Sequence, residues 1–133
     1  MDRKKVYYKK CYKQPQGDYT LCPAIYKEVI SRIERYPDEK RTIRVIEDKS
    51  AVNITEKDIA DKVVCERNIE ILKDTLTEWV AEEYRVMIWE NVETNCTWEY
   101  LADKYHVSKS TAKRVWKQYL YGLHIKLGLD YLH

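Results

Sequence analysis

Residues 55–94 contain neither glycine nor proline, and this uninterrupted stretch of forty residues limits the folds open to the chain. Thr55 followed by Asp58 predicts a capping box at its start, with aspartate in place of glutamate. The stretch is compatible with one very long helix or with two helices that meet at a bend near residues 78–83. Helical spacing predicts one apolar face over its first half, formed by Ile59, Val63, Ile69, Leu72 and Leu76.

The whole chain shares this scarcity of turn residues, with three glycines and three prolines among 133 residues. Repeated hairpins between strands need such residues, so the composition favours an all-α fold. We expect a helical N-terminal part, a long central helix and a C-terminal helix-turn-helix. The expected units are a basic flexible arm at 1–20, a helical region with the long helix at 21–80, and a DNA-binding domain at 81–133.

The N-terminal half gives weaker signals. Lysine and tyrosine interleave in residues 1–20, which is compatible with a grip on phosphates or with a solubilising tail. Pro23 is suited to the first turn of a helix, and we expect Pro37 to end that helix. Residues 38–54 are expected to be loop or helix, although the alternation in "RTIRVIED" is also compatible with a short strand.

Several functional classes find no support in the sequence. Cys11, Cys22, Cys65 and Cys96 lack the spacing of a zinc site, so we expect reduced thiols, no metal and no cofactor. The histidines lie near no nucleophile at a catalytic spacing, and no glycine-rich phosphate loop is present, so we expect no enzyme. No apolar run is long enough to span a membrane, and the basic N-terminus is not followed by a signal-peptide core. These features predict a cytoplasmic protein.

The segment "LADKYHVSKSTAKRVWKQYL", residues 101–120, fits two short helices that meet at a tight corner. Ala102 is the small residue needed where the helices cross, and Val107 fills the corner. Thr97 and Ser108 are suited to cap the two helices. His106 occupies the corner position that needs a positive φ, which histidine tolerates. The inner faces are expected to hold Leu101, Tyr105, Ala112 and Val115.

Positive charge gathers on the outer face of this unit. Residues 104–133 hold six lysines and arginines against one acid, and residues 1–13 hold the same numbers, whereas residues 14–103 hold twelve against twenty acids. Lys109, Ser110, Lys113 and Arg114 are expected to meet base edges in the major groove of double-stranded DNA. The remaining expected DNA-binding residues, through phosphate contact or a capping role, are Lys104, Ser108, Thr111 and Lys117. A lysine-rich solvated hairpin for protein contact is the plainer alternative.

The stretch "YRVMIWENVETNCTWEYLADKYHVSKSTAKRVWKQYLYGL" resembles region four of bacterial sigma factors. The layout of the whole chain is similar to phage-encoded late transcription activators of the RinA and ArpU type. This resemblance implies a positive regulator of late or packaging genes that acts with host RNA polymerase in the cytoplasm of a bacterial cell. The acidic middle of the chain is then a candidate polymerase-facing surface.

Two other functions stay open at this point. A phage DNA-packaging protein similar to a small terminase subunit also uses a helix-turn-helix, and it assembles into rings. A helical adaptor would use the same unit to bind protein and not DNA. Leu120, Leu123 and Leu127 extend an apolar stripe past the corner, which is compatible with packing onto residues 82–92 or with a seam between copies in a homo-oligomer.

Overall fold

The computed structural model describes residues 19–129, and within them it contains helices and no strand. The predicted all-α fold is confirmed for this part of the chain. The predicted basic arm lies almost entirely outside the described residues. The elements, in chain order, are α2 (Pro23–Glu34), α3 (Tyr36–Glu47), the short 3-10 helix η1 (Ala51–Asn53), α4 (Glu56–Trp79), α5 (Glu82–Thr94), α6 (Trp98–Lys104) and α7 (Lys109–Lys126).

Prolines begin both of the first two helices. Pro23 lies in the first turn of α2, as predicted. The prediction that Pro37 ends this helix is wrong, because α2 ends at Glu34 and Pro37 lies in the first turn of α3. A proline there loses no helical hydrogen bond, since the first N–H groups of a helix have no partner within it. The prediction of loop or helix for residues 38–54 is confirmed, because α3 runs to Glu47 and η1 follows after a short loop, and the alternative of a strand at "RTIRVIED" is excluded.

Two helices, and not one, occupy residues 55–94. The predicted capping box is present, with reciprocal 3.1 Å bonds between the backbone N–H and side-chain oxygen of Thr55 and Asp58. The chain turns at Val80, whose backbone is extended, within the predicted bend. Arg85 stabilises the end of α4, since its guanidinium donates to the carbonyls of Val80 and Thr77 at 2.8 Å each.

The apolar face predicted for α4 is wrong in its first half. Leu72 is buried and Ile69 and Leu76 pack against the core, but Ile59 and Val63 are exposed. The physical reason is the six-residue gap between Val63 and Ile69. A helix turns about 100° per residue, so this gap places the second group about 120° around the helix from Val63, on a different face.

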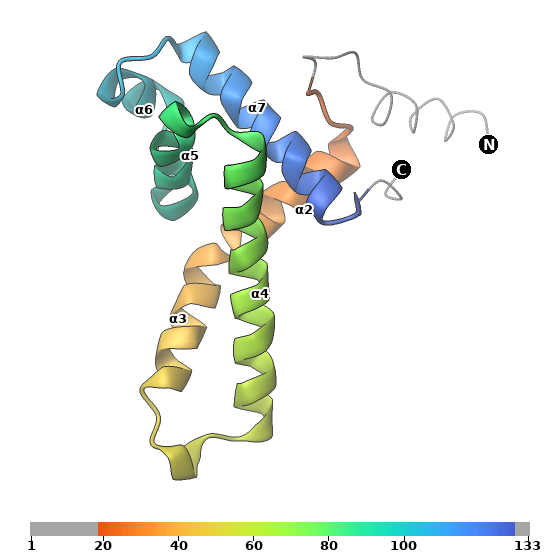
Figure 1. The fold of residues 1–133 in the computed structure, drawn as a ribbon, viewed down its shortest axis with the longest axis vertical. Coiled ribbons are helices and arrows are strands. Elements are labelled where there is room, and N and C mark those ends of the chain that lie inside the picture. The colour runs from red at the N-terminus through yellow and green to blue at the C-terminus, as the bar shows by residue number, and fades with distance from the viewer. Residues whose placement is uncertain (1–18, 130–133) are drawn as a thin grey trace, which may run out of the picture.

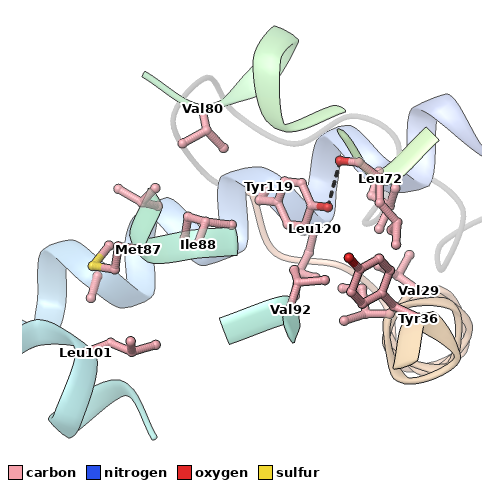
Figure 2. Close-up of a cluster of buried hydrophobic side chains, with 14 of the residues drawn as sticks. Val29, Tyr36, Leu72, Val80, Met87, Ile88, Val92, Leu101, Tyr119 and Leu120 are labelled. Carbon is pink, nitrogen blue, oxygen red and sulfur yellow. Dashed lines mark hydrogen bonds between the residues drawn. The ribbon is translucent and has the colours of Figure 1, made fainter. Parts of the chain in front are cut away.

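Helices α3 and α4 form a hairpin that projects from the rest of the molecule (Figure 1). The other end of α4 meets α7 and α5, and α2 lies against α7. The core sits at this end and draws a side chain from each α-helix, including Val29, Leu72 and Leu120 (Figure 2). The Tyr119 hydroxyl donates to the Leu72 carbonyl at 2.9 Å, which fixes α7 on α4.

The C-terminal half of α7 packs within its own chain, but mainly against α4. Of the two predicted alternatives, packing onto residues 82–92 is present in part, because α5 accounts for only some of the contact. Gly122 lies so close to Trp79 that an added Cβ would fall 2.2 Å from the indole ring. Lys126 forms an ion pair with Glu78 at 2.7 Å. α7 is therefore held along its second half, while its first half extends beyond α4.

Candidate nucleic-acid interface

Helices α6 and α7 form the predicted helix-turn-helix, and each begins with the predicted cap. The Thr97 hydroxyl accepts from the N–H of Tyr100 at 3.2 Å. The Ser108 hydroxyl accepts from the N–H of Thr111 at 3.1 Å. His106 has a φ of 57°, so the unusual backbone angle falls at the residue where the sequence predicted it. The corner therefore has the local geometry that its residues encode.

The inner faces of the two helices meet as expected. Two residues from each helix are buried where the helices cross, and Val107 packs against them from the corner. The Val107 N–H donates to the carbonyl of Ala102 at 3.0 Å, which draws the corner onto α6. The buried residues of the crossing are Leu101, Ala102, Ala112 and Val115.

An aromatic contact that sequence reasoning missed closes the open end of the crossing. The ring centroids of Trp98 and Trp116 lie 5.1 Å apart, and Trp116 lies 5.8 Å from Tyr119. Trp98 is the first residue of α6 and Trp116 lies midway along α7. The contact joins residues eighteen positions apart, so no helical periodicity reveals it. It adds an aromatic contact between α6 and α7.

Glu90 in α5 holds the C-terminal end of α6. Its carboxylate accepts from the Lys104 ammonium at 2.9 and 3.0 Å and from the Tyr105 hydroxyl at 2.6 Å. The hydrogen bond from Tyr105, followed by that from Lys104, lowers the pKa of Glu90. The same bonds raise the pKa of Lys104 and of Tyr105. Lys104, predicted as a phosphate contact, is thus bound within the protein.

The turn that leads into the unit is also fixed. Asn95 ends α5 in a left-handed conformation with a φ of 55°. Asparagine is among the few residues that adopt this angle readily. The Asn91 amide donates to the carbonyl of Cys96 at 2.8 Å, which closes the turn before Thr97. These bonds position α6 on the core through α5.

The eight predicted DNA-binding residues divide into two groups. Ser108 and Thr111 are engaged in the cap, where their hydroxyl oxygens lie 2.8 Å apart. Lys109 forms an ion pair with Glu99 at 2.6 Å, and this hydrogen bond lowers the pKa of Glu99. Lys104 is bound to Glu90, as described above. Ser110 is exposed, with its hydroxyl 3.2 Å from that of Ser108. Of the eight, the basic residues that lie exposed and form no ion pair within residues 19–129 are Lys113, Arg114 and Lys117.

This second group shares one exposed face on the first half of α7. Lys113 and Lys117 are four residues apart and so lie one above the other, with Arg114 beside them. The whole of α7 contains no aspartate or glutamate. Lys113, Arg114 and Lys117 therefore have no acid on their own helix, and the nearby Glu99 of α6 pairs with Lys109.

Known proteins offer no guide to this surface, since no family model, curated protein or solved structure matches the chain. Within residues 19–129, no helix is apolar over a length that could cross a membrane, and no cluster of side chains is arranged to hold a metal ion. Cys65 and Cys96 form no disulfide in this part of the chain. The exposed basic face of α7 is the candidate functional site.

Proposed function

We propose that this protein is a sequence-specific, DNA-binding transcription regulator, and that the first half of α7 enters the major groove. The observation that carries this proposal is the exposed face formed by Ser110, Lys113, Arg114 and Lys117 at the start of a capped helix. A major groove about 12 Å wide admits an α-helix. Basic side chains there can contact guanine edges or phosphates.

Each residue of the interface has a proposed role. Lys113 and Arg114 read base edges, because they lie on the exposed side of the first turns of α7. Lys117 lies one turn further on and contacts a phosphate. Ser110 is short and contacts a base edge or a phosphate from the first turn. Glu90 is a positioning residue, since it acts by fixing α6 through Lys104 and Tyr105.

Lys109 has a conditional role in this scheme. Its ammonium group faces Glu99, but both side chains are more than half exposed, so the pair is weak in water. A phosphate that approaches the start of α7 competes with Glu99 for this lysine. Lys109 therefore joins the interface when DNA is bound.

The regulator is proposed to activate phage late or packaging genes together with host RNA polymerase. The resemblance of residues 84–123 to sigma-factor region four supports this finer proposal, because that region works next to polymerase at promoters. Glu82 and Glu83 supply a candidate contact, since they are exposed at the start of α5 beside Val86, which is 66% exposed. Acidic and apolar side chains next to each other suit a protein partner.

Selection of bound sequences from a mixed pool of duplex DNA at two salt concentrations tests the proposal. A defined motif is expected to be enriched by the wild-type chain and lost with Arg114→Ala. Arg44→Ala is the matched control, because Arg44 is an exposed arginine on α3, away from α7. If nothing is enriched and weak binding disappears with salt, sequence-specific regulation is wrong.

A further inference from the structure

An exposed apolar patch lies on the projecting half of α4. Ile59, Val63 and Val64 are 58%, 59% and 57% exposed, and Ala60 is exposed between them. Single exposed apolar residues are ordinary on a protein surface. Four on two consecutive turns of one helix form a continuous patch, and such patches mark contact surfaces.

The patch lies on the side of α4 that faces away from α3. Asp58 binds Lys49 at 2.8 Å, Lys62 binds Glu47 at 3.3 Å, and Asn68 donates to Glu39. These contacts mark the side turned toward α3 and the loop after it. At about 100° per residue, Ala60 and Val63 fall on the opposite side, and Ile59 and Val64 lie at its two edges. In Figure 1, α3 is the one labelled helix beside this half of α4.

Opposite charges flank the patch. Glu56 lies about one turn before Ala60, and Arg67 lies about one turn after Val63. Both side chains are exposed, and neither forms an ion pair within the described part of the chain. An acid at one end and a base at the other make this surface complementary to its own antiparallel copy. Charge complementarity therefore selects a second copy of this chain as the occupant.

We propose that two copies of the protein associate through antiparallel pairing of α4 about a two-fold axis. The spacings from Glu56 to Ala60, Val63 and Arg67 are four, three and four residues, which is the spacing of a helix-pair seam. With the axis between positions 61 and 62, Ala60 opposes Val63 of the second copy. Glu56 then opposes Arg67 of the second copy, and Ile59 and Val64 lie on the two flanks.

The contact is self-complementary, as a two-fold interface requires. The dimer contains two Ala60–Val63 layers and two Glu56–Arg67 layers, with Ile59 and Val64 along the edges of the contact. The small side chain of Ala60 lets the two helices approach closely. The inference does not depend on DNA binding, because the pairing surface lies on α4 and the basic face lies on α7.

Sedimentation equilibrium of the full chain, over a range of concentrations, tests the pairing. The wild-type protein is expected to reach twice the chain mass. Val63→Glu is expected to weaken association at least ~10-fold, because it places a carboxylate in an apolar contact. Val86→Glu is the matched control, since Val86 is an equally exposed valine on α5. Circular dichroism checks that helix content is unchanged.

Charge reversal tests the antiparallel register. Glu56→Arg places two arginines opposite each other in both outer layers, and Arg67→Glu places two glutamates there. Each single change is expected to weaken the dimer, and the double variant is expected to restore it. A monomer at all concentrations, a larger ring, or equal loss with Val63→Glu and Val86→Glu would overturn the proposal. Failure of the double variant to recover would overturn the register.

Discussion

The ammonium group of Lys109, at the first position of α7, lies 2.6 Å from the carboxylate of Glu99 in α6. The pair crosses the corner of the helix-turn-helix and places an acid beside the proposed DNA-binding face. The hydrogen bond from Lys109 also lowers the pKa of Glu99. If α7 binds DNA as proposed, Glu99 is expected to oppose that binding in two ways, by engaging Lys109 and by repelling phosphate.

Glu99→Gln is expected to tighten DNA binding about two- to tenfold and to steepen its salt dependence. Releasing Lys109 adds up to one phosphate contact, which increases the magnitude of the log–log salt slope by about 0.9. Fluorescence anisotropy with a labelled duplex at several salt concentrations measures both quantities. Glu66→Gln is the control, because it removes an exposed carboxylate from α4. An unchanged slope and affinity would show that the pair does not restrain Lys109.

Substitutions of Arg114 and of Lys117 are expected to affect DNA binding in different ways. Arg114→Ala should weaken binding to the selected sequence by about 1–3 kcal/mol and relax specificity at one position. Lys117→Ala should weaken binding to all sequences alike and reduce the salt slope by about 0.9. Competition assays with selected and scrambled duplexes separate the two patterns. Equal loss on both duplexes for Arg114→Ala would contradict base readout by that residue.

Glu90→Gln is expected to lower the melting temperature in a pH-dependent way. The lowered pKa of Glu90 means that its stabilising contribution is complete above the pKa of an unfolded glutamate, about 4.3, and is lost as pH falls through the folded value. The raised pKa values of Lys104 and Tyr105 affect stability at the alkaline end of the pH range. Their contribution is complete below about pH 10 and is lost above it.

The difference in melting temperature between wild type and Glu90→Gln should therefore be largest between about pH 5 and 9. It should shrink in acid, where the wild-type carboxylate also becomes neutral. Melting curves across this range measure it, with Glu34→Gln as a control for loss of an exposed carboxylate on α2. A difference that stays constant down to pH 3 would contradict a charged Glu90 as the cause.

Gly122→Ala is expected to destabilise the fold. The added Cβ would meet the Trp79 ring at 2.2 Å, closer than real contacts allow. Overpacking of this kind costs about 1–3 kcal/mol, more than the roughly 0.5–1 kcal/mol that alanine gains over glycine within a helix. Urea denaturation measures the change. In a Trp79→Ala background the same substitution should cost less, and an undiminished cost would place the strain elsewhere.

Glu82→Lys together with Glu83→Lys is expected to leave DNA affinity unchanged or slightly higher and to reduce transcription activation. The two side chains lie exposed at the start of α5 and are not part of the basic face of α7. A transcription assay with bacterial RNA polymerase and a promoter that carries the selected motif measures activation. Unchanged activation would exclude this acidic surface as the polymerase contact.

Local signals in the sequence predicted local structure well. The caps at Thr55, Thr97 and Ser108 and the positive φ at His106 each depend on residues within one turn, and each is present. Pro37 misled because proline is compatible with the start of a helix as well as with its end. A proline in the sequence therefore marks a boundary between helices more clearly than it shows whether a helix ends or begins there.

Contacts between distant residues could not be predicted in this way. Glu90 and Lys104 are fourteen residues apart, and Leu72 and Tyr119 are forty-seven apart. No periodicity links such pairs, so the division of the predicted site into engaged and exposed residues needed the three-dimensional structure. The exposed patch on α4 was hidden for a related reason, because Ile59 and Val63 had been assigned to the buried face.

The most direct test of the central proposal is a titration of the isotope-labelled protein with a selected duplex, followed by the backbone amide signals in NMR spectra. The proposal predicts that the largest shifts fall on residues 108–117, around Lys113 and Arg114, and that the distal half of the α3–α4 hairpin is unaffected. Shifts spread over α3 and α4, or absent from residues 108–117, would contradict the proposed DNA-binding role of α7.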